Sequence, residues 1–409
     1  MRISRVMLFM VITIQGQTVE LVVHYDKKPT IMAAQMVEIY LDSLLTAEKA
    51  LNHSYVLSFF HGEAPIRVSY TKIEEEIAID TIIISGNNEI SGNTAFRLIA
   101  PIIHLTTRFE PIQQVNWIES SYNFFQNSIG LMYGRSQDGR LAAVVELTPA
   151  FESNFSGILG VRQDAGGIWK TTGEFDIHLE NIWQSASTSE LYWQRQNEQS
   201  QVLSFSHEEP ALLGIPFGIR IKFDQELRDG EYVYGAQEVK ILTGGTRYGR
   251  WLFGGSTVNI NPTEIGTLVG LSQHKSSAIS IGLEKDSRIN RWTPFDGSYW
   301  DMTMTMGDQT EGNKKSLQGN WLISLGSYWP ITSRFSAHTR LLTIGRWVKN
   351  GAIHKGQKIR YGGVNDLRGY RDDQFISNSI LIPTFELVTS AWNNLQLFCL
   401  LYTSDADDE

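Results

Sequence analysis

The sequence has a single cysteine, Cys399, so the chain can form no internal disulfide and no cluster of thiolate metal ligands. It also lacks a basic excess. The formal net charge is −9, which argues against a nucleic-acid-binding protein because phosphate recognition needs a basic face. No uninterrupted apolar stretch approaches the ~18 residues of a membrane-spanning helix. Any part of this chain that enters a bilayer would therefore do so as strands of a barrel.

Proline is scarce, whereas glycine and aromatic residues are abundant. The 409 residues include 11 prolines and 35 glycines, and 11% of them are aromatic. Hydrophobic residues make up 42%, which is enough for a sizeable folded core. This composition favours a long all-β protein over a helical one.

The N-terminus has the layout of a secretory signal peptide. Arg2 and Arg5 give a positive start, and an apolar run over residues 6–14 is followed by small and polar residues. We therefore expect residues 1–18 to be a signal peptide. The alternative for the same pattern is a buried first strand.

The next segment, up to residue 150, mixes helical and strand patterns. Apolar residues at helical spacing predict a helix over 30–47, and β-rich runs predict strands over 54–60 and 66–73. A strand over 77–85 is expected to stop at Gly86-Asn87. Two helices should follow over 94–103 and 110–126. The last two strands, over 128–134 and 141–147, are joined by the turn 136–139.

The order strand, helix, helix, strand, strand, with Ile-Ile-Ile-Ser-Gly-Asn-Asn at the end of its first strand, resembles a POTRA domain. POTRA domains are periplasmic polypeptide-binding modules that precede outer-membrane barrels. The resemblance implies a POTRA domain over 75–150, with Gly86 and Asn87 as its strand-end motif. It also implies a partial POTRA-like or other α+β segment over 19–73, where no first strand is recognisable. An unrelated small α+β domain is the alternative for both.

From residue 154 onwards, apolar and polar residues alternate with period two. Met302, Met304 and Met306, for example, alternate with Thr303 and Thr305. One apolar and one charged face, sustained without a helical pattern, favour a membrane barrel over a soluble sandwich. A propeller is the main soluble alternative, but no repeat of about forty residues recurs. Tryptophans near the expected strand ends fit interfacial girdles: Trp169, Trp183, Trp193, Trp292, Trp329 and Trp347.

We expect eleven strands between residues 154 and 346. The alternation first suggests about twelve. The first strand is expected to enter the membrane from the periplasm, and the last strand before the loop over 361–375 must run outwards. The number of strands before that loop must therefore be odd. The error is expected in residues 230–275, where glycine and asparagine interrupt the alternation.

Residues 361–375, Tyr-Gly-Gly-Val-Asn-Asp-Leu-Arg-Gly-Tyr-Arg-Asp-Asp-Gln-Phe, follow the last of these strands. They resemble the sixth extracellular loop of the outer-membrane barrel assembly family, the BamA/TamA-type bacterial surface antigen barrels, which carries Gly-Gly and then Val/Leu-Arg-Gly-Phe/Tyr. Residues 284–300 resemble a periplasmic turn of that family, and 327–335 resemble its next short turn. The matching residues are Gly362, Gly363, Leu367, Arg368, Gly369 and Tyr370 in the loop, and Asp286, Arg288, Pro294 and Gly297 in the turn.

This resemblance covers residues 75–398 and implies an α+β POTRA-like N-terminal region followed by an antiparallel transmembrane β-barrel. In the family the barrel has sixteen strands, and the loop folds into the lumen, where its arginine is anchored to polar groups of the wall. For this chain it implies that Arg368 makes charge-assisted hydrogen bonds to the wall. Gly369 would allow a close approach, and Tyr370 would pack with a polar tip. Asp372 and Asp373 could be local partners of Arg368 or a solvated acidic pair, and we expect the solvated pair.

Only two strands, over 379–388 and 394–398, are expected after the loop, so residues 154–398 are predicted to be an incomplete barrel. The family's usual wall partners of Arg368 would lie on missing strands. Residues 399–409 are acidic and resemble the translation of a transposase end sequence used in making sequencing libraries. We expect them to be a non-native tail.

The sequence contains no nucleotide-binding, zinc-protease or serine-hydrolase motif, so we expect no enzyme activity, cofactor or metal. A barrel protease or lipase is the alternative, since His178 shares a face with Glu174, Asp176 and Glu180.

The resemblance implies a protein that assembles, inserts or translocates polypeptides at the outer membrane of a Gram-negative bacterium. The POTRA region would lie in the periplasm and bind clients, and the barrel would template insertion. The implied partners are the outer-membrane bilayer, unfolded client outer-membrane proteins, periplasmic chaperones and accessory lipoproteins, with no nucleic acid. The alternative is a two-partner-type secretion pore exporting a dedicated exoprotein, in which residues 30–47 would be a plug helix.

Overall fold

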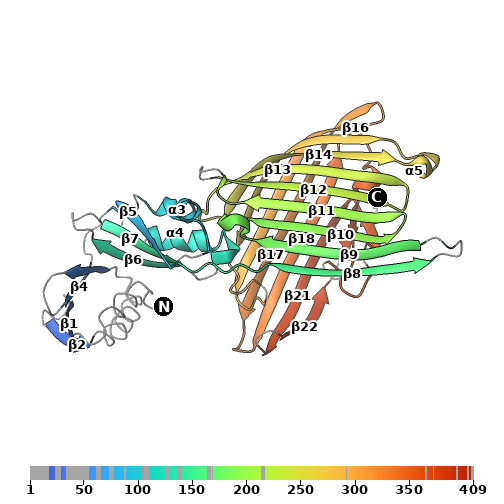
Figure 1. The fold of residues 1–409 in the computed structure, drawn as a ribbon. Helices are drawn as coiled ribbons and strands as arrows, with labels where there is room; N and C mark the ends of the chain where they lie inside the picture. Colours follow the sequence, from blue (N-terminus) through green and yellow to red (C-terminus); the bar gives the residue numbers. More distant parts are fainter. Residues whose placement is uncertain are drawn as a thin grey trace. The chain divides into compact units, whose positions relative to one another are not determined.

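A computed structural model describes residues 18–23, 29–33, 55–60, 66–72, 78–86, 89–103, 105, 110–125, 129–135, 141–163, 167, 169–212, 217–291, 293–363, 366–371, 373–392, 395–402 and 405–406. The chain divides into two compact units, residues 1–150 with 245–247 and residues 151–244 with 248–409. Figure 1 shows the mixed α/β elements of the first unit and the long strands of the second.

The first unit contains one sheet with strand order β2-β1-β4-β3-β6-β7-β5. The same pairing pattern occurs twice in it: β1 lies parallel to β4, which pairs antiparallel with β3, and β5 lies parallel to β7, which pairs antiparallel with β6. A short parallel pairing of β3 with β6 joins the two groups. The strands are β1 (Thr18–Val23), β2 (Pro29–Ala33), β3 (Tyr55–Phe60), β4 (Ile66–Lys72), β5 (Thr81–Ser85), β6 (Ile129–Arg135) and β7 (Leu141–Leu147).

The helices of this unit lie in the chain between β5 and β6. They are α3 (Gly92–Ile99), η1 (Ala100–Ile102), α4 (Glu110–Glu119) and η2 (Asn123–Phe125). The side chain of Ser91 caps α3 by accepting a hydrogen bond from the backbone N–H of Thr94. Ile99 of α3, Ile118 of α4 and Phe125 of η2 are fully buried, so each of these helices turns an apolar side towards the core. The predicted order strand, helix, helix, strand, strand is confirmed, as are strands β3 and β4.

Two expectations for the N-terminal segment are wrong in part. Residues 29–33 form β2 rather than the start of a helix, because their backbone pairs antiparallel with β1 over the whole strand. Tertiary pairing here overrides the apolar spacing that favoured a helix. A first strand, β1, is also present where the sequence revealed none. Residues 1–17, 34–47 and 136–139 lie outside the described residues.

The second unit is one antiparallel sheet in which every strand from β8 to β18 pairs with its neighbours along the chain, followed by β21 and β22. Eleven described strands therefore precede the long loop, as predicted. They are β8 (Asn154–Gln163), β9 (Trp169–Glu180), β10 (Thr188–Asn197), β11 (Ser200–Glu209), β12 (Gly218–Arg228), β13 (Tyr232–Leu242), β14 (Arg250–Pro262), β15 (His274–Asp286), β16 (Gly297–Glu311), β17 (Lys314–Pro330) and β18 (Phe335–Val348).

Short elements complete this unit. They are η3 (Ile182–Gln184), α5 (Glu264–Leu268), η5 (Lys355–Gln357), β19 (Ile359–Tyr361), β20 (Phe375–Ser377), β21 (Ser379–Trp392), β22 (Leu395–Tyr402) and β23 (Asp405–Ala406). The helix α5 was not expected. It forms because the Thr263 side chain accepts a hydrogen bond from the N–H of Gly266 and so caps a turn between β14 and β15.

The long sheet has one apolar face and one polar face. On the apolar face, Ile279, Met304 and Met306 are more than half exposed, and the residues between them point to the other side. An apolar face this extensive matches the lipid-facing surface of a transmembrane barrel. Among the described residues, no helix is long and apolar enough to cross a membrane.

The sheet curls round the loop between β18 and β21, residues 349–378. The loop contacts β12 through Arg228 and Asp373, and it contacts β21 through Arg368 and Glu386, although β13 to β18 lie between these two strands. A flat sheet could not bring both strands to one loop. The curled sheet is visible in Figure 1, and β8 and β22 are the edges of its described strand order. We call its concave, polar side the lumen.

Candidate functional site

The loop docks on the lumen wall through an apolar cluster. Leu367 is 1% exposed and packs with Leu342 of β18 and with Ile380 and Ile382 of β21, all of which are buried. Ile359 and Tyr361 of β19 belong to the same cluster. The motif residue Leu367 therefore fixes the loop by burying its side chain against the inner surface of the wall.

Arg368 lies next to Leu367 and contacts the wall through a carboxylate. Its Nη1 is 3.4 Å from Oε1 of Glu386 on β21, and the Arg368 side chain is 40% exposed whereas that of Glu386 is 6% exposed. The other carboxylate oxygen of Glu386 lies 3.2 Å from Nδ1 of His338 on β18. A partner for Arg368 is thus present on a strand of this chain, where the resemblance placed it on missing strands.

Glycines and aromatic rings shape the rest of the loop. Gly362, Gly363 and Gly369 have φ values of +125°, +89° and +96°, a region that favours glycine. A Cβ on Gly362 would lie 2.5 Å from the carbonyl oxygen of Arg371. Tyr370 is half exposed and packs edge-on against Phe375 at a ring distance of 5.1 Å.

Two ion pairs, formed by Asp373 and Lys355 of the loop, also hold it. Nη1 of Arg228, on β12, lies 2.7 Å from Oδ2 of Asp373. The Asp373 side chain is exposed, as we expected, but it also forms an ion pair. Nζ of Lys355 lies 2.6 Å from Oε2 of Glu231. Asp372 lies outside the described residues. These contacts place the loop between opposite parts of the wall.

One acidic loop residue, Asp366, is half-buried, and no arginine is bonded to its carboxylate in the described structure. Burial raises the pKa of the Asp366 carboxyl above its ordinary value, although Arg340 and a backbone hydrogen bond from Gly362 oppose the shift. Docking of the loop therefore favours the protonated form of Asp366.

The predicted periplasmic turn, between β15 and β16, is held by a bidentate ion pair. Arg288 donates from Nε and Nη2 to the two carboxylate oxygens of Asp286, at 2.9 and 2.6 Å. Gly297 has φ +103°, and a Cβ there would lie 2.3 Å from the carbonyl oxygen of Ser287. Pro294 lies in the same turn, just before the bridge of Ile289 with Asp296.

The structure brings the two predicted motifs together through the lumen wall. The guanidinium of Arg288 lies over the ring of Tyr299, 4.7 Å from its centroid, and the Tyr299 hydroxyl is 3.4 Å from Nε2 of His338. His338 contacts Glu386, which contacts Arg368. The turn motif and the loop motif are therefore the two ends of one chain of contacts. Neither Tyr299 nor His338 was singled out from the sequence.

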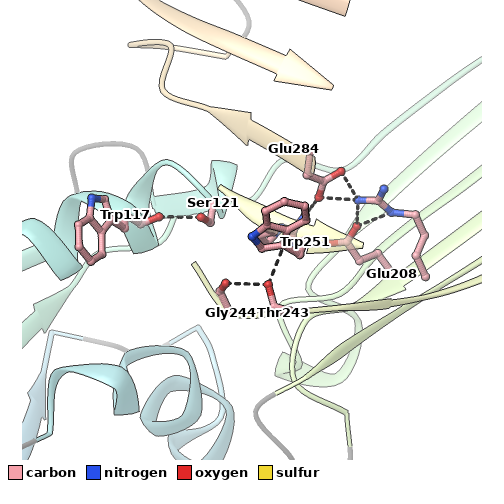
Figure 2. A network of polar contacts seen from close by, with 9 residues as sticks. Trp117, Ser121, Glu208, Thr243, Gly244, Trp251 and Glu284 are labelled. Atoms are coloured by element: carbon pink, nitrogen blue, oxygen red, sulfur yellow. Dashed lines mark hydrogen bonds and ion pairs between the residues drawn. The ribbon is translucent and has the colours of Figure 1, made fainter. Parts of the chain in front are cut away.

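A four-charge cluster on the same wall was also missed. Arg220 donates to Glu208 at 2.8 Å and to Glu284 at 2.9 Å, and Arg250 contacts the same two carboxylates. Figure 2 shows Glu208 and Glu284 on the two sides of a guanidinium group. The residues come from β11, β12, β14 and β15, so only the register of the sheet assembles them.

The polar residues that suggested an enzyme are engaged in structural contacts. Glu180 accepts two hydrogen bonds from Arg291, at 2.6 and 2.8 Å, and one from the backbone N–H of Glu152. His178 lies 3.0 Å from Glu180 and 3.3 Å from Glu190. Within the part of the chain that the structure describes, no group of three potential metal ligands occurs.

The strand-end motif of the first unit is only partly described. Gly86 has φ +74°, and a Cβ there would lie 3.1 Å from Glu146 Cγ and from the carbonyl oxygen of Leu147. A glycine therefore suits the end of β5. Asn87 lies outside the described residues.

Comparisons with known proteins give the following matches. A family model described as the Omp85 superfamily domain matches residues 164–399. CdiB from Acinetobacter baumannii is 11% identical over 98% of this chain and 76% of its own, with a TM-score of 0.53. CdiB from Escherichia coli is 13% identical over 92% and 76%, with a TM-score of 0.51. BamA from Haemophilus ducreyi, lacking POTRA domains 1–3, is 11% identical over 90% and 81%, with a TM-score of 0.47. No curated protein matches the chain.

Proposed function

The chain belongs to the Omp85 superfamily, and from that premise we propose that it assembles, inserts or translocates polypeptides at the outer membrane. The observation that carries the proposal is the loop docked in the lumen by Leu367 and Arg368. The docked loop occupies the space that a polypeptide would cross or fold beside. Its residues Gly362, Gly363, Gly369 and Tyr370 shape it, and the turn residues Asp286, Arg288, Pro294 and Gly297 support the wall beneath it.

We further propose that the first unit is a periplasmic POTRA region that binds clients. β5 is the edge strand of its sheet, and Ile83 on that strand is 52% exposed. An open edge with an apolar side chain suits the addition of an extended client strand by β-augmentation. Insertion of a client needs no cofactor, because burial of its apolar side chains and pairing of its strands in the bilayer drive the process.

The test is client insertion in lipid vesicles. The full chain is reconstituted, a urea-unfolded outer-membrane barrel protein is added, and its folded fraction is followed by the heat-modifiable shift in gel mobility. We expect faster folding than in empty vesicles, and slower folding with Arg368→Ala. Leu381→Ala, which alters the lipid-facing side of β21, is the matched control. Folding at the rate of empty vesicles would contradict assembly.

The second candidate is a two-partner-type secretion pore, and the likeness of fold to the two CdiB structures favours keeping it. The plug helix expected over residues 30–47 does not begin as a helix, because residues 29–33 form β2. Passage of an exoprotein out of vesicles, with no acceleration of barrel insertion, would support the pore in place of the assembly function.

A further inference from the structure

Most described arginines on the lumen wall have an acidic partner. Arg220, Arg228 and Arg250 each have a carboxylate oxygen within 2.9 Å. These pairs neutralise guanidinium groups that the wall partly removes from water, which would otherwise be costly.

Arg346 of β18 departs from this pattern. It belongs to the same lumen-facing set of alternate residues as His338 and Leu342, and it is partly buried. Its backbone N–H donates to the carbonyl of Asn378, but its guanidinium makes no ion pair or hydrogen bond with any described residue. The five donors of the guanidinium are therefore not satisfied by the described residues, and solvent or a ligand can satisfy them.

Among the described residues, no acidic side chain lies beside Arg346 in the register of the wall. Its cross-strand partner on β17 is Asn320, whose amide donates to Thr305 Oγ1 at 3.0 Å, and the alternate residues on its own strand are Ile344 and Val348. The ionisable side chains that interact with it electrostatically are Tyr234 of β13 and His274 of β15. The carboxylates that act on Tyr234 are each paired with a lysine or an arginine; they are Asp224, Glu226 and Glu238. Arg346 therefore carries a positive charge that no described carboxylate pairs with.

A second buried polar side chain interacts electrostatically with Arg346. His274 is fully buried, and neither of its ring nitrogens is hydrogen-bonded to a described residue. The ring of His354 packs against it at 5.4 Å. A buried imidazole with two unsatisfied nitrogens is rare, and it calls for a bound group or water nearby.

We propose that Arg346 forms an oxyanion site on the lumen wall that binds a phosphate or carboxylate group. The planar fork of a guanidinium matches two oxygens of such an anion and binds them more strongly than chloride. The group can come from a free anion or from an acidic side chain of a polypeptide in the lumen. The site does not depend on the proposed function.

The test uses the full chain in detergent and follows thermal unfolding while inorganic phosphate replaces chloride at constant ionic strength. We expect phosphate in the low millimolar range to raise the unfolding temperature of the wild type. In Arg346→Gln the half-saturating concentration should rise at least about tenfold, since a hydrogen bond to a charged group contributes roughly 1.5–3 kcal/mol. Arg334→Gln, which removes an exposed turn arginine, should respond like the wild type. An unchanged response in Arg346→Gln would overturn the proposal.

Two further measurements keep the proposal open to refutation. In chloride alone, Arg346→Gln should be at least as stable as the wild type, because it removes an unpaired charge. A clear loss of stability there would mean that Arg346 has a protein partner, and the site would be wrong. Arg346→Lys keeps the charge but loses the fork, so its half-saturating phosphate concentration should also rise. If Arg346→Gln does not fold, an unchanged value in Arg346→Lys overturns the proposal.

A peptide arm distinguishes the two sources of the anion. A short glutamate peptide and its glutamine counterpart are added in place of phosphate. Stabilisation by the glutamate peptide alone, lost in Arg346→Gln, supports an acidic polypeptide segment as the ligand. Stabilisation by phosphate but by neither peptide supports a small free anion. A failure of both anions to stabilise the wild type contradicts the site.

Discussion

Substitution of Leu367 by alanine should release the loop from the lumen wall. Leu367 is 1% exposed in a cluster formed by side chains of two wall strands and of the loop itself. Truncation to alanine would leave a cavity between Leu367, Leu342 and Ile382, because the wall strands are fixed by pairing on both sides and cannot collapse into it.

The size of the effect follows from similar buried leucines. Leu-to-alanine changes in cores cost about 2–5 kcal/mol, and we take about 3 kcal/mol for this site. This cost falls on docking of the loop rather than on the sheet, whose strands keep their hydrogen bonds. At about 1.4 kcal/mol for each factor of ten, the undocked fraction should rise by roughly a hundredfold.

Limited trypsin digestion measures the undocked fraction. The loop contains Arg371 and other trypsin sites, and we expect the backbone at these sites to enter the protease much more readily when the loop leaves the wall. At low protease the rate then follows the open population. We expect cleavage after Arg371 to accelerate by roughly a hundredfold in Leu367→Ala. The matched control is Leu381→Ala, since Leu381 is 44% exposed on the lipid-facing side of β21. Wild-type kinetics in Leu367→Ala, or an equal acceleration in the control, would refute this account of docking.

Six further substitutions test four other features of the structure. Arg368→Ala should speed the same cleavage less than about fivefold, because its 3.4 Å contact is partly exposed. Glu386→Ala should speed it more, since it removes the carboxylate that His338 and Arg368 share. Arg220→Gln and Arg250→Gln should each lower the free energy of unfolding by about 3–5 kcal/mol in denaturant titrations. The loss in the double variant should differ from the sum of the two single losses. Lys315→Gln, at an exposed ion pair, should change the free energy of unfolding little. Gly297→Ala should reduce the folded fraction in gel-shift assays far more than Gly270→Ala, which has a similar positive φ but open space around it. The docked loop raises the pKa of Asp366, so docking is favoured below the ordinary aspartate pKa and weakened as the pH rises through the raised pKa. Asp366→Asn removes the charge and should therefore slow trypsin cleavage at neutral pH. Faster cleavage in this variant would contradict the predicted direction.

The sheet could be predicted because its determinants are local. The alternation of Met302, Met304 and Met306 with threonines sets the faces of β16, and its partner strands follow along the chain. The rule that the outward loop follows an odd number of strands corrected the count to the eleven that are described. The long loop was recognisable because glycine and arginine stand at fixed places in it.

The partners across the lumen could not be predicted, because they depend on how far the sheet curls. Arg228 and Asp373 are 145 residues apart in the sequence, and no local pattern relates them. Glu386 looked like an ordinary polar residue of a terminal strand, and only the register places it beside His338. The β2 strand was mistaken for a helix because its pairing with β1 is likewise absent from the local pattern.

Docking of the loop is distributed over several kinds of contact, and this has a consequence for its release. The apolar contact of Leu367 is independent of salt and pH, whereas the Arg368–Glu386 and Arg228–Asp373 contacts are partly exposed and weaken with salt. Because they act on different wall strands, losing one ion pair leaves the loop attached elsewhere. An incoming polypeptide would have to displace Leu367 to open the lumen, since that contact has the largest cost of removal. The contacts from Arg288 through Tyr299, His338 and Glu386 then link the turn between β15 and β16 to the loop.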